Sequence, residues 1–253
     1  MFTEAESNHE NRIVSSDFPE TADIETASEG YASRFSGAVG TWMLNVQTEV
    51  TLQMLKDYPQ ATVLDVGGGH GQITAPLIAN GYQVTVLGSS EVCRARIQHW
   101  LNSNHCCFQV GNVLDLPYPD QAFDVVISYR FLAHVTQDKK FLSELARVAK
   151  KAVIIDYPTV QSVNAIAPYL FRFKKQLEGN TRRFICYQEA EIKAYLKSLG
   201  LQTAERYPQF FFPMVLHRML KSPSFSSTLE QSVRSLKLTH FFGSPVIAKF
   251  TKG

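Results

Sequence analysis

Residues 63–72 read VLDVGGGHGQ and join an apolar run to three consecutive glycines, a histidine and a fourth glycine. The run that follows, residues 72–79, can form a helix with one apolar face. A strand, a glycine turn and a helix in this order bring backbone amides and a helix N-terminus close to a bound ligand. The spacing Gly67-x-Gly69-x-Gly71 is one residue shorter than the dinucleotide fingerprint. These residues therefore predict a ligand loop without identifying the nucleotide.

Short β-rich runs alternate with helical patterns after the glycine loop as well. The expected strands are residues 61–66, 82–87, 105–110, 123–128 and 151–156, and the expected helices between them are 71–79, 90–101 and 138–149. Nearly continuous apolar strands with helical crossovers predict an α/β fold, a doubly wound and mostly parallel sheet with helices on both faces. Ligands bind beyond the carboxyl ends of such strands, which is where the glycine loop lies.

The composition bounds the class of protein. A chain of 253 residues suits one large domain, its hydrophobic content of 45% supplies an ordinary core, and a net charge of +2 excludes no function class. The cysteines form no C-x-x-C pair, so we expect neither a disulfide framework nor a metal site: Cys93, Cys106, Cys107 and Cys186. No signal-peptide pattern begins the sequence, and no apolar run approaches the ~20 residues that cross a bilayer. We expect a cytoplasmic protein without a membrane span.

The amino-terminal residues differ from the rest in charge. Residues 1–30 carry eight acidic residues against one arginine and few large apolar residues. This pattern predicts a mobile acidic tail over residues 1–25, followed by a single domain over residues 26–253. Order is expected to begin at the capping box Thr26-Ala27-Ser28-Glu29, ahead of a helix over residues 41–58 that Pro59 ends.

Three separated motifs occur in order along the chain. They are VLDVGGGHGQ, then GNVLDLPYPDQAFDVVISYRFLAHV at residues 111–135, then FLSELARVAKKAVIID at residues 141–156. Together they resemble class I S-adenosylmethionine (SAM) dependent methyltransferases, and more narrowly the small-molecule branch that includes quinone-biosynthesis methyltransferases. The resemblance implies a Rossmann-like seven-stranded sheet whose last strand is antiparallel. It places strand six near residues 201–207 and strand seven near residues 244–250.

The resemblance also implies a cofactor site for SAM. Gly67, Gly69 and Gly71 would let the backbone approach the methionine and ribose, and Asp65 would order the loop amides and help to hold the methionine ammonium. The competing interpretation makes Asp65 a strand-terminal turn residue and the glycines ordinary turn chemistry.

Strand two departs from the family. The family ends this strand with an acid that accepts hydrogen bonds from the ribose hydroxyls, and Gly88 stands at the matching position. Three readings stay open: simple drift, a ribose contact from Ser89 or a water, or a methyltransferase fold that no longer binds SAM. In the adenine pocket the usual Gly-Asp is Gly111-Asn112, where the carbonyl oxygen of Asn112 can meet the adenine amino group and Val113 can supply a backbone amide.

Further cofactor contacts are implied on both sides of the glycine loop. Ser128 and Tyr129 end strand four, which lies beside the sulfonium in the family. Tyr31 and Arg34 resemble the family's amino-terminal Tyr/Arg element, in which the guanidinium can meet the methionine carboxylate. The competing interpretation of Arg34 is a solvated arginine on a short helix.

A general base is needed only if the methyl acceptor is not already ionised. The candidates are His134, Tyr129 and His217, with no favourite among them, and the competing interpretation of His134 as a structural histidine is the stronger one. Residues 157–187 and 208–242 mix aromatic and basic residues and are expected to form helical lid insertions over an apolar or anionic acceptor, or alternatively an ordinary helical cover.

The sequence therefore predicts a SAM-dependent methyltransferase that acts on a small molecule at oxygen or carbon. The Asn/Asp-Pro-Pro-Tyr/Phe signature of enzymes that methylate nucleobase amino groups is missing from strand four, and the basic residues form no long stripe, so DNA is not an expected partner. The alternative from another class is a non-catalytic subunit with the SAM fold that acts through a protein partner.

Overall fold

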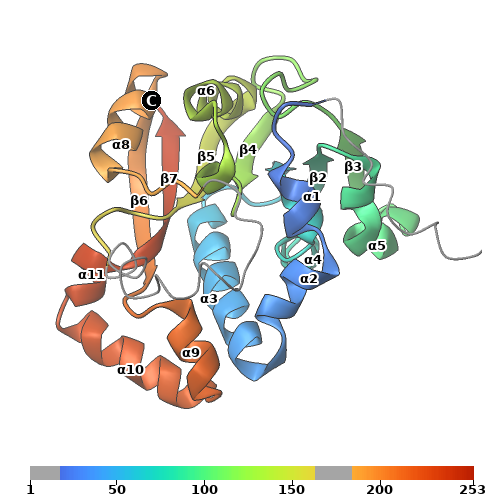
Figure 1. The fold of residues 1–253 in the computed structure, drawn as a ribbon. Coiled ribbons are helices and arrows are strands. Elements are labelled where there is room, and N and C mark those ends of the chain that lie inside the picture. The colour runs from blue at the N-terminus through green and yellow to red at the C-terminus, as the bar shows by residue number, and fades with distance from the viewer. Residues whose placement is uncertain (1–17, 163–183) are drawn as a thin grey trace, which may run out of the picture.

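A seven-stranded sheet forms the centre of the protein (Figure 1). The computed structural model describes residues 18–162 and 184–253. Its strands lie in the spatial order β3-β2-β1-β4-β5-β7-β6, with these bounds: β1 (Thr62–Val66), β2 (Gln83–Gly88), β3 (Cys106–Val110), β4 (Phe123–Ser128), β5 (Ala149–Tyr157), β6 (Leu201–Phe210) and β7 (Ser244–Lys252). Strands β1 to β5 pair in parallel, and β7 runs antiparallel to both β5 and β6. The predicted doubly wound sheet with an antiparallel last strand is confirmed.

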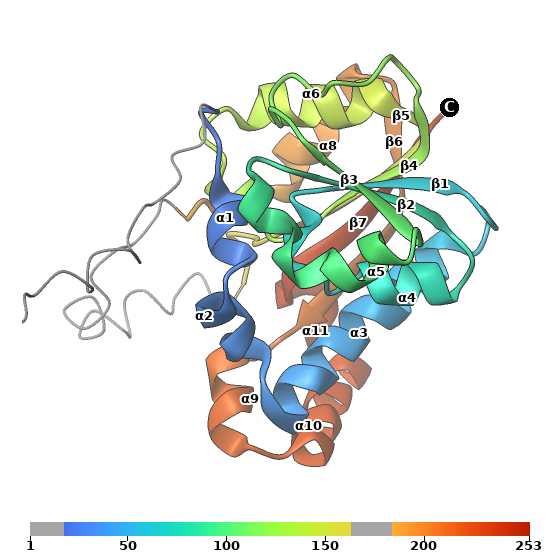
Figure 2. The ribbon, with the colours of Figure 1, turned by 90° about the vertical axis from the view of Figure 1, so that its right-hand side faces the viewer.

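Helices cover both faces of the sheet, as Figure 2 shows with the strands almost edge-on. One face carries α3 (Gly37–Leu55), α4 (Thr74–Ala79) and α5 (Gln98–Asn102), and the other carries α6 (Asp138–Val148) and α8 (Glu189–Ser198). Side chains alternate along each strand, so Val63 packs into the core on the α3 side and Leu64 into the core on the α6 side. This double burial is why the strands read as continuous apolar runs.

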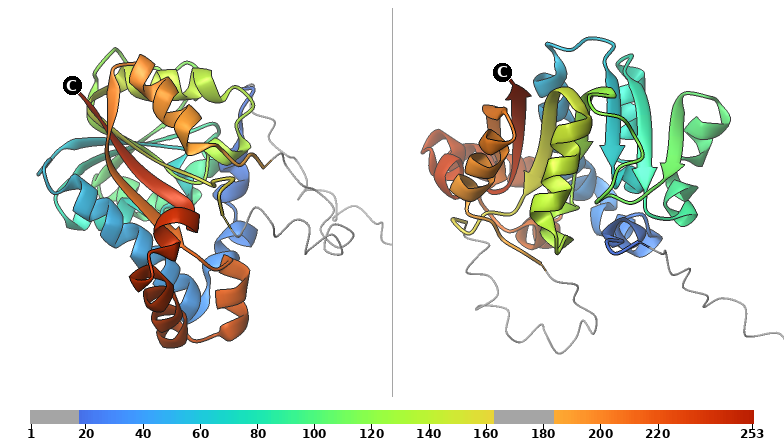
Figure 3. Two further views of the ribbon diagram at one scale, coloured as in Figure 1. Left: turned by 90° about the vertical axis from the view of Figure 1, so that its left-hand side faces the viewer. Right: turned by 90° about the horizontal axis from the view of Figure 1, so that it is seen from above.

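Three further helices lie beyond one end of the sheet, next to the beginning of α3 (Figure 3): α9 (Met214–Leu220), α10 (Pro223–Ser235) and α11 (Leu238–Phe242). A small apolar cluster joins them to α3, with Val39 and Met43 of α3 packed on Phe210 at the end of β6. These helices lie in the predicted insertion at residues 208–242. The middle of the other predicted insertion, residues 163–183, lies outside the described residues.

The helices that follow β1 and β2 differ from the predicted ones. Gly71 has a φ of 68°, in the left-handed region, so the expected helix over residues 71–79 begins only at Thr74. Before it, residues Gly68–His70 form the 3₁₀ turn η2. The helix expected over residues 90–101 is the 3₁₀ segment η3 (Glu91–Ile97) followed by α5.

The amino-terminal prediction is wrong at its boundary. A mobile tail was expected through residue 25, but helix α1 (Ala22–Thr26) precedes α2 (Glu29–Ala32) and η1 (Ser33–Phe35). Glu20 is only 5% exposed and accepts hydrogen bonds from the backbone amides of Thr136 (2.8 Å) and Gln137 (3.2 Å). Acidic residues here cap backbone groups of other elements, which composition alone cannot show. Residues 1–17 lie outside the described residues.

Among the helices of residues 18–162 and 184–253, none combines the length and the apolar character that crossing a bilayer requires.

Candidate functional site

The predicted cofactor loop lies at the carboxyl end of β1, as expected for a doubly wound sheet. Gly67 has a φ of 76°, which a residue with a side chain rarely adopts, and its amide donates to the carbonyl oxygen of Leu87 (2.8 Å). At Gly69 an added Cβ would lie 2.5 Å from the carbonyl oxygen of Cys93 in η3. The glycines are therefore required by backbone conformation at Gly67 and by close packing at Gly69.

Asp65 places an unpartnered carboxylate behind this loop. Its side chain is fully buried, and neither carboxylate oxygen accepts a hydrogen bond from any described residue. Burial raises the pKa of Asp65 to about 7, although the nearby Arg130 guanidinium opposes the shift. A buried acid without partners is costly to ionise, and a cationic group brought next to it would reduce that cost. Ser128 ties the end of β4 to β1 by donating to the carbonyl oxygen of Val66 (2.9 Å).

The acid that lies at the end of β2 is Asp23, which comes from the amino-terminal helix α1. An added Cβ at Gly88 would lie 2.8 Å from the Cβ of Cys93 and 3.0 Å from the ring of Phe108, so the strand has no ready space for a side chain there. The carboxylate of Asp23 on α1 accepts from the backbone amide of Ser89 (2.5 Å), from its hydroxyl (2.5 Å) and from the thiol of Cys93 (3.4 Å). Both donors of Ser89 are thus already engaged by a residue 66 positions away.

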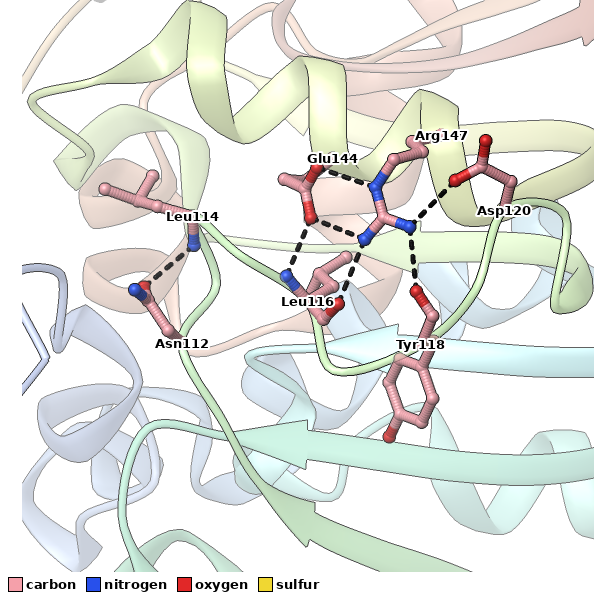
Figure 4. A network of polar contacts seen from close by, with 7 residues as sticks. All are labelled: Asn112, Leu114, Leu116, Tyr118, Asp120, Glu144 and Arg147. Atoms are coloured by element: carbon pink, nitrogen blue, oxygen red, sulfur yellow. Dashed lines mark hydrogen bonds and ion pairs between the residues drawn. The ribbon is translucent and has the colours of Figure 1, made fainter.

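Hydrogen bonds within the loop after β3 and from α6 hold this loop in place, as Figure 4 shows. The side-chain oxygen of Asn112 accepts from the backbone amide of Leu114 (3.0 Å), which turns the chain, and Val113 is fully buried in the core. Arg147 of α6 holds the rest of the loop by donating to the carbonyl oxygens of Leu116 (2.9 Å) and Tyr118 (2.7 Å). The predicted adenine contact from Asn112 would have to share an oxygen that is already in use.

A cavity of about 290 Å³ opens at the same end of the sheet, beyond β4, β5 and β6. Most of its lining is apolar, and the lining residues come from all parts of the chain: Tyr31, Phe35, Met43, Gln47, Arg130, Ala133, His134, Asp156, Pro158, Ser162, Phe184, Cys186, Gln209, Phe210, Met214, Ser244 and Pro245. The carboxyl ends of parallel strands meet at this edge, so residues distant in sequence converge on one space.

Arg130 and Asp156 are the charged residues of this lining. Arg130 has a φ of 59°, and its backbone amide donates to the carboxylate of Asp156 (2.6 Å). The guanidinium stacks over the ring of Phe35, 4.3 Å from the ring centre, and donates through Nη2 to Gln47 (2.5 Å). Burial raises the pKa of Asp156 to about 6. The sequence alone predicted no role for either residue, although Arg130 lies just beyond one predicted strand and Asp156 ends another.

The three base candidates are not brought together. His134 lines the cavity, and its ring lies 5.7 Å from that of Phe184. Tyr129 points instead into the core on the α3 side, where its hydroxyl is paired with Thr51 at 2.7 Å, and burial raises its pKa strongly. His217 is fully buried, and its Nε2 is paired with Glu230 at 2.9 Å. The geometry therefore supports His134 and gives no support to Tyr129 or His217 as a base.

The two residues of the amino-terminal Tyr/Arg pair also differ in position, because one lines the cavity and the other does not. Tyr31 lines the cavity, and burial raises its pKa. Arg34 stacks on Tyr31 at 5.0 Å, but its side chain is 54% exposed and forms a 3.8 Å ion pair with Glu25. Arg34 is not among the residues that line the cavity, so the guanidinium that faces a ligand there is that of Arg130.

Known proteins match the central part of this chain. Residues 64–155 match the family model described as a methyltransferase domain. Over these residues the chain resembles a methyltransferase domain. The match starts one residue before Asp65 and ends one residue before Asp156, so it includes the first of these two buried acids and stops just short of the second. The predicted resemblance to class I SAM-dependent methyltransferases is confirmed.

Relatives of the methyltransferase domain act on different molecules. Ajmaline N-methyltransferase of Rauvolfia serpentina is 25% identical over 146 residues, which are 58% of this chain and 46% of that protein. Demethylmenaquinone methyltransferase of Tropheryma whipplei (strain Twist) is 25% identical over 184 residues, which are 64% of this chain and 74% of that protein. The chain thus spans less than half of the first of these relatives.

A solved structure shares the fold over almost its full length. It is magnesium protoporphyrin IX methyltransferase from Synechocystis PCC 6803 with bound SAH (S-adenosylhomocysteine), which superposes with a TM-score of 0.63 over 92% of this chain and 98% of that one. The same protein has also been solved with bound SAM. At 16% identity the likeness establishes the methyltransferase fold alone.

Proposed function

We propose that this chain binds SAM and transfers its methyl group to a small-molecule acceptor, at oxygen or carbon of an apolar or anionic metabolite. The observation that supports this most directly is the adjacency of two features at one edge of the sheet. The glycine loop with the unpartnered Asp65 carboxylate ends β1, and the mainly apolar cavity lies beyond the neighbouring strands β4 and β5.

The residues of the loop fit the amino-acid end of SAM. Asp65 is a buried carboxylate that accepts no hydrogen bond from the described residues, and a ligand ammonium would supply the missing donors. Gly67 and Gly69 let the loop fold tightly against Phe131 and Cys93, which residues with side chains would prevent. When bound, SAM supplies an electrophilic methyl group on a positively charged sulfur.

The chain's own residues would then bind and orient the acceptor. Aromatic and aliphatic side chains such as Phe35, Met43 and Phe210 exclude water from the cavity and favour an apolar acceptor. Alignment of the acceptor atom with the methyl group supplies much of the rate in such a displacement. His134 lines the cavity and would accept a proton from an acceptor hydroxyl.

The first experiment measures the binding of SAM and of SAH to the purified full chain by calorimetry. Release of SAH from SAM is then followed with a panel of phenols, carboxylic acids, quinols and amines, with amines included because one relative is an N-methyltransferase. Binding of the cofactor together with turnover of a phenol, a carboxylic acid or a quinol supports the proposal. A chain that binds neither SAM nor SAH contradicts it and leaves the non-catalytic subunit as the alternative.

A further inference from the structure

The Arg130 guanidinium is a cation in a mainly apolar cavity and contacts no carboxylate of the described residues directly. Its Nη1 atom is buried and makes no hydrogen bond with any residue in 18–162 or 184–253, and no ion pair joins its side chain to a carboxylate of those residues. Asp156, which lines the same cavity, accepts a hydrogen bond from the backbone amide of Arg130 rather than from its guanidinium. The guanidinium charge opposes the rise in the pKa of Asp65 and of Asp156, but within the described part of the chain it has no direct carboxylate contact.

An arginine side chain stays protonated in proteins, so it cannot avoid this cost by releasing its proton. Arg130 as a whole is half-buried, but its Nη1 is buried, and a buried nitrogen of a charged group is costly unless it is hydrogen-bonded. The backbone of Arg130 is also in the left-handed region, at a φ of 59°, which is unfavourable for a residue with a side chain and is found preferentially at functional sites.

The contacts that Arg130 does make hold the guanidinium in place. Stacking on Phe35 fixes the plane of the group, and the bond to Gln47 fixes its rotation. One terminal nitrogen is thus tied down while the other is left without a partner. A planar donor group held in this way suits a planar, singly charged carboxylate better than a phosphate dianion, because no second cation lines the cavity among the described residues.

We propose that Arg130 is the carboxylate-binding residue of this cavity. The inference rests on the proposed function, and the carboxylate can come from two sources, the methionine part of SAM or an acidic methyl acceptor. In either case Arg130 takes the role that the sequence suggested for Arg34, whose side chain is exposed and paired with Glu25.

Two arms of one binding experiment separate the sources. The first compares SAH with 5′-methylthioadenosine, which keeps the nucleoside and lacks the amino acid. The second compares 2-naphthoic acid with its primary amide, in the presence of SAH, by ligand-observed NMR. Both arms use the parent chain, Arg130→Gln, and the control Arg94→Gln, which removes an exposed arginine that pairs with Glu91.

If the methionine carboxylate is the ligand, Arg130→Gln weakens SAH roughly tenfold or more and leaves 5′-methylthioadenosine within about twofold. If the acceptor supplies the carboxylate, the preference of the parent for the acid over its amide is lost while SAH binds as before. Arg94→Gln changes neither ratio. Because Arg130→Gln can disturb folding, Arg130→Lys is measured as well; it keeps the charge without the planar pair of donors and should give an intermediate loss.

The proposal is overturned if Arg130→Gln and Arg130→Lys change neither ratio, or if they weaken SAH and 5′-methylthioadenosine equally without affecting the acid preference. A parent chain that binds no SAH contradicts the proposed function instead. In that case the acid and amide comparison, run without SAH, still decides whether Arg130 binds a carboxylate.

Discussion

The contact between Asp23 and Ser89 should make the amino-terminal helix part of the stable fold. Asp23 is fully buried and accepts two hydrogen bonds of 2.5 Å from the amide and the hydroxyl of Ser89. Hydrogen bonds to a charged group contribute about 1.5–3 kcal/mol each, so two of them sum to about 3–6 kcal/mol. Helix α1 has only five residues and can undock so that water reaches Ser89. We therefore expect Asp23→Ala to lower the free energy of unfolding by about 2–4 kcal/mol.

The control is Glu29→Ala, which removes an acid on the neighbouring helix α2. The Glu29 side chain is 89% exposed and pairs with Arg96, so its loss should cost less than about 1 kcal/mol. Urea unfolding followed by tryptophan fluorescence gives the free energies, and hydrogen exchange at the amide of Ser89 reports local opening. The reasoning is refuted if Asp23→Ala and Glu29→Ala agree within about 0.5 kcal/mol in unfolding and leave exchange at Ser89 equally slow.

Three further predictions follow from the site. Burial raises the pKa of Asp65 to about 7, so its favourable contribution is present below about pH 4 and is lost as the pH rises through 7. Asp65→Asn should therefore raise the melting temperature of the ligand-free chain at pH 8 by more than at pH 5. The same variant should bind SAH more weakly by calorimetry. A variant that binds SAH normally would contradict a contact between Asp65 and the ligand ammonium. Gly69→Val would press a side chain against the carbonyl oxygen of Cys93, 2.5 Å from the new Cβ, and should abolish SAH binding at a cost of roughly 1–3 kcal/mol in urea unfolding. His217→Asn should lower stability by about 1–3 kcal/mol because the buried Glu230 loses its side-chain partner and keeps only two backbone amides. The pH profile of methyl transfer should stay unchanged in that variant, whereas His134→Asn should change the profile and not the stability.

Much of the fold could be predicted because its signals are local. Strands buried on both faces read as apolar runs, and helical patterns between them require parallel pairing, so β1 to β5 were placed within one or two residues. The antiparallel direction of the last strand could not be predicted from its own residues. Residues 244–250 have no local feature that gives their direction, and the expectation came from the resemblance to a family.

The glycine loop and the acid at the end of β1 were also within reach of the sequence. Asp65 and the glycines stand where a strand turns into a helix, and the close packing at Gly69 leaves no space for a larger residue. Which side chains of the strand ends face the cavity was not predictable from spacing. Tyr129 and Arg130 are neighbours, yet one points into the core and the other lines the cavity, because the left-handed backbone at Arg130 redirects the chain.

The sequence by itself determined the layered sheet, the loop after its first strand and the class of ligand that such a loop suits. The tertiary structure alone decided which residues complete the site. Asp23 lies in an acidic, weakly apolar stretch that predicts a tail, and only docking on the end of β2 gives it two donors and a buried position. A hydrogen bond between residues 66 positions apart leaves no periodicity, spacing or composition in the sequence, because it depends on where two separately formed elements meet in space.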